Sequence, residues 1–308
     1  MADRRLQVFH AVAKHLSFTK AAEALFMTQP AVTFQIRQLE EQFNARLFDR
    51  THGRIALTAA GQMALDYAER ILGLSAELDT RLKEVSGQLG GPLLIGASTT
   101  IAEFLLPQIL GEFKARAPGV VPRLFVANSE AVQARIVERT LDLGFIEGDS
   151  HLPSLVTDVC CDDELQVVCT PGHPLAKLNS ATPKSLTEHA YVSREPGSGT
   201  REVIDHYLQK AGVAPDSMQV VMELGSPEAV KGLVATGLGF AIMSRATVAK
   251  ETQLGQLVQI PLAPRLHRHL SVVYAKERFH SRLVSDFVTF AKERLAALQG
   301  GNAVRPAA

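Results

Sequence analysis

Apolar side chains recur at helical spacing along the first part of the chain. They predict one helix around residues 6–13, a second over 18–25 and a third over 28–44. Thr28 can cap the third helix, and Pro30 lies in its first turn, where a missing N–H group costs little. The pattern therefore predicts a compact head of short helices.

A wing and a long helix are predicted next. Residues 46–57 alternate short apolar runs with a basic turn at 51–54, which is typical of a two-stranded hairpin. Thr58 can cap a helix from 59 to about 86, spanning ~40 Å. We expect a partner helix to cover its apolar stripe, with packing inside the same chain as the alternative. The stripe consists of Tyr67, Ile71, Leu74, Leu78, Leu82 and Val85.

The pattern changes after a cluster of glycines and one proline at residues 87–92, which predicts a hinge between domains. Strand-like and helical segments then alternate up to residue 300, which indicates an α/β fold with a mainly parallel sheet. Residues 301–308 are predicted to be a disordered tail. Strands are expected at 93–95, 124–126, 141–146, 166–169, 218–223 and 240–242, and helices at 98–105 and 131–140.

Composition and charge narrow the class of protein. With 46% hydrophobic and 21% charged residues, the chain has the composition of a folded protein. Its formal net charge of zero divides into +3 for residues 1–58 and −3 for the remainder, which suits a head that binds a polyanion. No apolar run approaches the ~20 residues that span a bilayer, and the N-terminus lacks a signal-peptide pattern. We expect a cytoplasmic protein without membrane contact, whose three cysteines are buried free thiols.

The segment 17–40 predicts two crossed helices, the second of which presents polar side chains outward. Gln29 can bond an adenine edge, and Thr33 can offer a hydroxyl or a methyl group to bases. Arg37 is better placed for a phosphate. Phe34 is unusual on such a face: contact with thymine methyl groups and packing against the wing are equally supported.

This head closely resembles that of the LysR-type transcriptional regulators. The resemblance is carried, in order, by Ser17-Phe18-x-x-Ala21-Ala22, Thr28-Gln29-Pro30-Ala31-Val32, Leu47-Phe48-Asp49-Arg50, Ile55-Ala56-Leu57-Thr58 and Ala60-Gly61. It implies that Gln29, Thr33 and Arg37 lie in the major groove, although position 34 is often polar or basic in the family. His52 is equally well explained as a neutral turn residue. The candidate DNA-binding residues are Thr28, Gln29, Pro30, Thr33, Phe34, Arg37, Arg50, His52 and Arg54.

The resemblance extends over the whole chain and implies its architecture. The effector domain would resemble periplasmic binding proteins: two α/β lobes joined by crossover strands near 162–168 and 266–272, with the ligand in the cleft. A dimer or tetramer would bind a dyad-symmetric promoter site in double-stranded DNA, and RNA polymerase is a further candidate partner. The expected division is 1–58 winged helix-turn-helix, 59–86 linker helix, 87–92 hinge and 93–300 effector domain, with lobe 1 at about 93–162 and 268–300 and lobe 2 at about 163–267.

Three segments of the effector domain are suited to bind an anion. Residues 96–100 follow a strand and open a helix, so hydroxyl and N–H groups converge there. Residues 194–201, Arg-Glu-Pro-Gly-Ser-Gly-Thr-Arg, repeat this arrangement between two arginines, and residues 225–227 form a third such loop. Helix capping by the serines is the alternative, but it does not explain the arginines. The candidate effector-binding residues are Ser98, Thr99, Thr100, Arg194, Gly197, Ser198, Thr200, Arg201 and Ser226.

The loop at 194–201 also resembles that of LysR-type members that control carbon dioxide fixation or sulfur metabolism. This resemblance implies a small effector, phosphorylated or otherwise anionic. Glu147 and Glu223 are interpreted as solvent-facing or hinge-bonded charges.

The sequence lacks catalytic signatures such as Gly-x-Ser-x-Gly or His-Glu-x-x-His. His267 and His269 would share one face of a strand, where exposure is favoured over a metal site. We therefore expect no enzyme, no metal and no cofactor. The competing class is a solute-binding or enzymatic α/β protein with an accessory head, and DNA binding by residues 1–90 alone would discriminate between the two.

Overall fold

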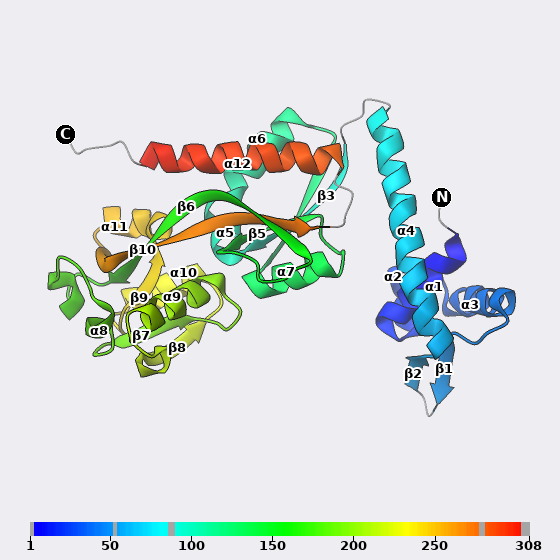
Figure 1. The fold of residues 1–308 in the computed structure, drawn as a ribbon, viewed down its shortest axis with the longest axis horizontal. Helices are drawn as coiled ribbons and strands as arrows, with labels where there is room; N and C mark the ends of the chain where they lie inside the picture. Colours follow the sequence, from blue (N-terminus) through cyan, green and yellow to red (C-terminus); the bar gives the residue numbers. More distant parts are fainter. Residues whose placement is uncertain (1–2, 52–53, 86–89, 277–280, 303–308) are drawn as a thin grey trace. The chain divides into compact units, whose positions relative to one another are not determined.

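The computed structural model describes residues 3–51, 54–85, 90–276 and 281–302 of the chain. It divides into two compact units, Met1–Gln88 and Leu89–Ala308, which are described separately (Figure 1).

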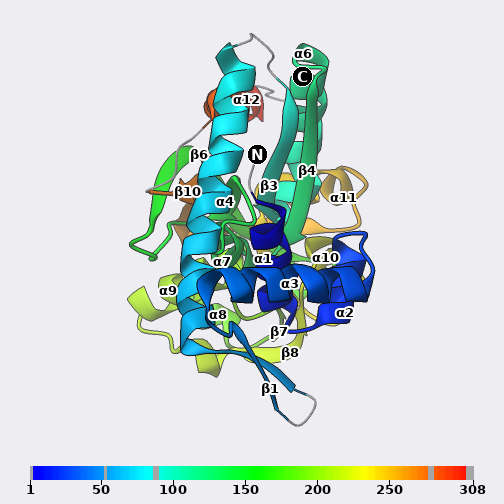
Figure 2. The same cartoon turned by 90° about the vertical axis from the view of Figure 1, so that its right-hand side faces the viewer.

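The first unit is a head of three helices and a wing, followed by one long helix. The second and third helices begin as predicted, because the Ser17 hydroxyl accepts a hydrogen bond from the N–H group of Lys20 and the Thr28 hydroxyl accepts one from Ala31. The wing extends from the head beside the start of the long helix (Figure 2). Its elements are α1 (Arg4–His15), α2 (Phe18–Ala24), α3 (Gln29–Phe43), β1 (Phe48–Thr51), β2 (Arg54–Leu57) and α4 (Ala59–Val85).

Two polar side chains hold the wing to the head. The Glu40 carboxylate on α3 accepts hydrogen bonds from the N–H groups of Leu47, at 2.8 Å, and Phe48, at 3.3 Å. The Thr58 hydroxyl donates to the Arg46 carbonyl at 2.6 Å and caps α4. The apolar faces of all these elements meet in one core, which also contains Ala68 of α4.

Beyond the head, α4 exposes the predicted apolar stripe. Tyr67, Ile71, Leu74, Leu78 and Leu82 are between 44% and 65% exposed, so the head does not cover them. The side chain of Val85, the last predicted member of the stripe, lies outside the described residues. Within the described part of the chain, no helix is long and apolar enough to cross a bilayer.

The second unit has two lobes joined by two long strands. Six strands form one sheet in the order β4-β3-β5-β10-β6-β9, and β7 pairs with β8 in a smaller one. In lobe 1, α6 and α12 pack on one face of the sheet and α7 covers the other (Figure 1). The elements of lobe 1 are β3 (Gly91–Ser98), α5 (Thr99–Phe104), α6 (Leu106–Arg116), β4 (Val120–Ala127), α7 (Ser129–Val137), β5 (Leu143–Glu147) and α12 (Arg282–Asn302).

Lobe 2 lies between the two crossover strands in sequence. Its apolar core is built on β6, β9 and β10 together with α9. The crossover strands are β6 (Leu155–Cys169) and β10 (Val258–Ala275). The remaining elements are η1 (Pro174–Lys177), α8 (Pro183–Leu186), β7 (Ala190–Arg194), α9 (Gly199–Lys210), η2 (Pro215–Ser217), β8 (Gln219–Leu224), α10 (Pro227–Ala235), β9 (Ala241–Ser244), η3 (Arg245–Val248) and α11 (Ala249–Gln253).

The sheet differs from the mainly parallel one that the sequence predicted. β3 pairs in parallel with β4 and β5, but β10 pairs antiparallel with both β5 and β6, and β6 pairs antiparallel with β9. The reason is connectivity: β6 leaves lobe 1 and β10 returns to it, so the two run in opposite directions side by side. The sheet is therefore mixed.

Several predicted boundaries also shift. β3 begins at Gly91, inside the segment expected to be a hinge, whereas residues 86–89 lie outside the described ones. The helix predicted at 131–140 starts earlier, at Ser129, because the Asn128 side chain caps it. At the C-terminal end α12 continues to Asn302, so residues 301 and 302 are helical, and the rest of the predicted tail, 303–308, is not described.

Two of the three cysteines are buried as the sequence predicted. Cys161 and Cys169 are buried, Cys160 is half-buried, and all three are free thiols. Burial raises the pKa of Cys169 to about 11, which keeps this thiol protonated at neutral pH.

Candidate functional site

The outer face of α3 is the first candidate site. Val32, Ile36 and Leu39 on its inner face are fully buried, which turns the opposite face to the solvent. The Thr28 hydroxyl is used as the helix cap, so it shapes the start of α3. Thr33 is half-buried, and the remaining predicted residues of the helix are exposed, namely Thr28, Gln29, Pro30, Phe34 and Arg37.

The hydroxyl of Thr33 has a partner inside the helix. It donates a hydrogen bond to the Gln29 carbonyl at 3.0 Å. Its proton is therefore engaged, so Thr33 could offer a base only its methyl group and the oxygen lone pairs. The Gln29 side chain, in the first turn of α3, has no partner within the described part of the protein and keeps both amide functions available.

The wing carries the other predicted DNA-binding residues. Arg50 lies in β1, where its backbone pairs with Ile55, and Arg54 lies in β2 opposite Thr51. The side chains of both arginines, and the whole of His52, lie outside the described residues.

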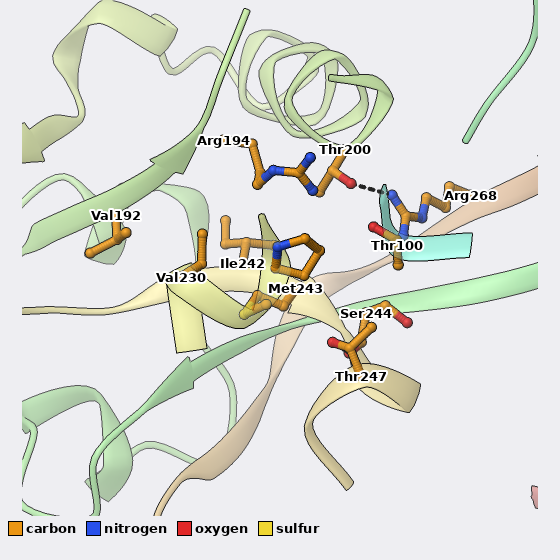
Figure 3. A pocket seen from close by; sticks show the side chains of 11 residues that line it. Thr100, Val192, Arg194, Thr200, Val230, Ile242, Met243, Ser244, Thr247 and Arg268 are labelled. Carbon is orange, nitrogen blue, oxygen red and sulfur yellow. Dashed lines mark hydrogen bonds between the residues drawn. The ribbon is translucent and has the colours of Figure 1, made fainter. Parts of the chain in front are cut away.

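The second candidate site is a pocket between the lobes (Figure 3). It contains about 290 Å³ of empty space, part of it open to solvent. Side chains with hydroxyl or guanidinium groups occupy one part of its wall, and Val192, Val230 and Ile242 form an apolar part (Figure 3). The complete lining is Thr100, Val192, Arg194, Thr200, Pro227, Val230, Ile242, Met243, Ser244, Thr247 and Arg268.

Arg194 connects the two lobes at this pocket. It stands at the end of β7 in lobe 2 and is 6% exposed. One guanidinium nitrogen donates to the Thr99 hydroxyl of lobe 1 at 2.7 Å, while Nε lies 2.8 Å from the Glu195 carboxylate. Arg194 therefore already has a counter-ion, and it also holds Thr99 beside the pocket.

Arg268 is the second buried arginine, and the sequence reasoning did not single it out. It lies on β10 and is 4% exposed. Its Nη1 donates to the Thr200 hydroxyl at 2.6 Å (Figure 3). Its Nε donates to the Asp163 carboxylate at 2.8 Å. His267 and His269 are exposed as predicted, and in a strand the residue between them must face the interior. That alternation was the available signal.

A buried carboxylate pairs with Arg268 outside the residues that line the pocket. Glu147, at the end of β5, is 3% exposed, accepts a hydrogen bond from the Ser129 hydroxyl at 2.8 Å and lies 4.0 Å from Arg268. Burial alone would raise its pKa, but Arg268 and the hydroxyls of Ser129 and Thr100 outweigh it, so the pKa of Glu147 is lowered. Glu147 is therefore an ionised carboxylate within the lobe interface.

Two matches with known families decide what this arrangement is. Residues 4–62 match "Bacterial regulatory helix-turn-helix protein, lysR family", and residues 86–296 match "LysR substrate binding domain". The chain belongs to the LysR family. It is a LysR-type transcriptional regulator with an effector-binding domain, as the sequence predicted.

Individual relatives agree with the assignment to the LysR family. A "Probable RuBisCO transcriptional regulator" from Cyanophora paradoxa is 36% identical over 287 residues, covering 92% of this chain and 89% of that protein. The regulatory domain of CcmR from Synechocystis PCC6803, solved in complex with 2-PG, is 27% identical with a TM-score of 0.61, covering 66% of this chain and 96% of that one. Full-length CbnR in complex with its target DNA is 22% identical with a TM-score of 0.62, covering 96% and 100%.

In this LysR regulator the predicted effector residues separate into two groups. Thr100, Arg194 and Thr200 line the pocket, and Thr99 bonds to Arg194. Five others are not among the lining residues: Ser98, Gly197, Ser198, Arg201 and Ser226. Arg201 instead pairs with the exposed Glu223, and the Ser226 hydroxyl bonds to Glu103 at 3.4 Å.

Two interpretations from the sequence change with this geometry. None of Ser98, Ser198 and Ser226 makes a side-chain capping hydrogen bond, so helix capping does not account for them. Glu147 is buried, so it does not face the solvent, and its ion pair with Arg268 of the crossover strand β10 agrees with the hinge-bonded alternative. In the described ranges, no three His, Cys, Asp or Glu side chains gather in a way that would hold a metal ion.

Proposed function

We propose that this LysR-type regulator binds a dyad-symmetric promoter site through α3 and the wing, and that a small anionic metabolite bound between its lobes controls this binding. In this proposal Gln29 and Thr33 read base edges, and Arg37, Arg50 and Arg54 contact the phosphate backbone. The protein would act in the cytoplasm, where its DNA lies, and the pocket would bind its ligand without catalysing a reaction.

The observation that carries the effector proposal is the convergence of two buried arginines and four hydroxyls on one pocket. Arg194 comes from lobe 2 and Arg268 from a crossover strand, so a ligand that contacts both would connect lobe 2 to that strand. Guanidinium groups and hydroxyls are the usual partners of phosphate and carboxylate oxygens. The hydroxyls belong to Thr100, Thr200, Ser244 and Thr247.

The carboxylates that pair with the two arginines indicate which contacts a bound anion would replace. Glu195 pairs with Arg194, and Asp163 and Glu147 surround Arg268. A bound anion would take over hydrogen bonds that these carboxylates now accept, and would thereby change the contacts between the lobes. The complex of the related CcmR regulatory domain with 2-PG supports a ligand of this class.

Control of DNA binding would follow from differential affinity. The exposed stripe of α4 would pair two chains, so that two α3 helices reach successive major grooves about one turn, ~34 Å, apart. The ligand can shift the arrangement of such a dimer or tetramer only by binding one arrangement more tightly than the other.

The test compares the buried Arg194 with the exposed Arg265 as a matched pair. The purified full chain should gain thermal stability with 2-PG, since a ligand bound only to the folded state raises Tm. Arg194→Ala should lose this gain, whereas Arg265→Ala, whose exposed side chain pairs with Glu164 and does not line the pocket, should retain it. Both variants should still bind promoter DNA. If both variants lost the 2-PG response equally, the effector site would not be this pocket.

A further inference from the structure

Phe34 occupies the centre of the outer face of α3. Val32, Ile36 and Leu39 define the buried side of the helix, and at about 100° per residue Phe34 points directly away from them. Its side chain is 59% exposed. Pro30, one turn before, and Arg37, one turn after, lie on the same face.

The fold of the head does not explain this exposed ring. The aromatic contacts of the head join Phe48 to Phe9 and to Phe18, and none involves Phe34 within the described part of the chain. Packing of Phe34 against the wing, which the sequence left open, would bury the ring and is not what the structure shows. The ring is therefore available to a partner.

The neighbouring charge restricts the chemistry of that partner. Arg37 is exposed and has no ion pair among the described residues, and the head as a whole carries a positive excess. A matching surface must offer anionic groups beside an apolar group. The major groove of duplex DNA does so: phosphates line its edges, and the 5-methyl group of thymine is the apolar feature of its floor.

We propose that Phe34 is a specificity-determining residue that contacts the 5-methyl group of a thymine in each half-site. The inference rests on the proposed function, because it assumes that α3 enters the major groove. It adds the identity of one base feature that this chain reads.

The test removes the methyl group from the DNA and the ring from the protein, separately and together. The full chain first selects its preferred duplex from a random-sequence pool, and each thymine of that duplex is then replaced in turn by deoxyuridine, which lacks only the 5-methyl group. The Kd of each duplex is measured at one fixed salt concentration for the wild type, Phe34→Ala and Phe34→Leu. Gln29→Ala is the matched control from the same helix.

For the wild type, we expect one deoxyuridine position per half-site to weaken binding about fourfold, the value of one buried methyl group. Phe34→Ala should bind the thymine duplex more weakly and be insensitive to deoxyuridine at that position, whereas Phe34→Leu and Gln29→Ala should remain sensitive. Because Phe34 is exposed, Phe34→Ala should keep the wild-type Tm.

Three results would overturn the proposal. Wild-type binding that ignores every deoxyuridine substitution would exclude methyl reading. Equal sensitivity of Phe34→Ala and the wild type would assign the methyl contact to another residue. If Phe34→Ala bound DNA as the wild type does, the ring would not contact DNA and would instead be available to a protein partner. If the wild type selects no sequence at all, the proposed DNA-binding function fails, and this inference fails with it.

Discussion

At the scale of single residues, the candidate pocket was predictable only where the sequence carries a motif. Arg194 and Thr200 lie at the ends of a glycine-rich loop, so their types and spacing pointed to a ligand. Arg268 lies between two histidines on a strand with no such motif, and only the alternation of the strand shows that it faces inward. Glu147 was singled out, but its burial and its pairing with Arg268 were not predicted, because Arg268 is far away in sequence.

Gln29→Ala tests base reading on α3. We expect a loss of about 1–3 kcal/mol on the specific site and little change on random DNA, because the amide can bond a base edge bidentately. Competition binding at one fixed salt concentration measures both values. An equal loss of binding free energy on specific and random DNA would show that Gln29 does not read a base and contacts only the DNA backbone.

Glu147→Gln tests the buried carboxylate. Because its pKa is lowered in the folded protein, ionised Glu147 stabilises the fold above its ordinary pKa of 4.5, and this contribution disappears as the pH falls below 4.5 through the lowered value. We expect Tm to fall less steeply in Glu147→Gln than in the wild type as the pH is lowered through this range. Parallel curves of Tm against pH would show that Glu147 contributes nothing to acid sensitivity.

At the scale of elements, helices were predicted better than crossover strands. Capping residues and regular apolar spacing predict the helices of the head from the sequence. β6 contains Asp158, Asp162, Asp163 and Glu164, which interrupt any apolar run, so its first half was not predicted. These acids are accommodated by partners that are distant in sequence, such as Lys292 for Asp158, at 2.7 Å. Local pattern cannot reveal such pairs.

The start of α9 depends on a close approach between the lobes. A Cβ on Gly199 would lie 2.5 Å from the Glu147 carbonyl oxygen and 2.8 Å from the Ser129 hydroxyl. Gly199→Ala should therefore destabilise the effector domain by about 1–3 kcal/mol, the usual cost of overpacking. Gly225→Ala is the control, because its Cβ would meet only Glu195, at 3.9 Å. Urea unfolding of both variants measures the difference, and equal stabilities would contradict the close contact.

At the scale of the whole molecule, the sequence was sufficient for the two-unit organisation. It predicted a winged helix-turn-helix, a long helix and an α/β domain, because each carries its own periodicity and a glycine-rich cluster separates the long helix from the α/β domain. The division into two lobes was implied by the resemblance to the LysR-type regulators. The mixed sheet was not predicted, since strand direction depends on which strands become neighbours. Which strands become neighbours depends on the order of the elements along the whole chain.

The exposed stripe of α4 predicts self-association. Replacing Leu74 and Leu78 together by Glu places charges on a face that we expect a second α4 to cover, so the protein should become monomeric or much weaker in association. Sedimentation velocity measures this, with Gln62→Ala, away from the stripe, as the control. An unchanged sedimentation coefficient of the double variant would show that α4 does not join the chains.

The way in which α4 joins the head has a geometric consequence. Ala68 is part of the head core, and the stripe continues to Leu82 on the same uninterrupted helix. The direction in which the stripe faces is therefore fixed relative to α3. One residue inserted after Ala68 would rotate everything beyond it by about 100°. The rotation of α4 about its axis should therefore determine which half-site separation the protein can bind. Seven inserted residues, about two turns, should nearly preserve this rotation. Insertions of three and of four residues differ by about 100°, so one should not substitute for the other.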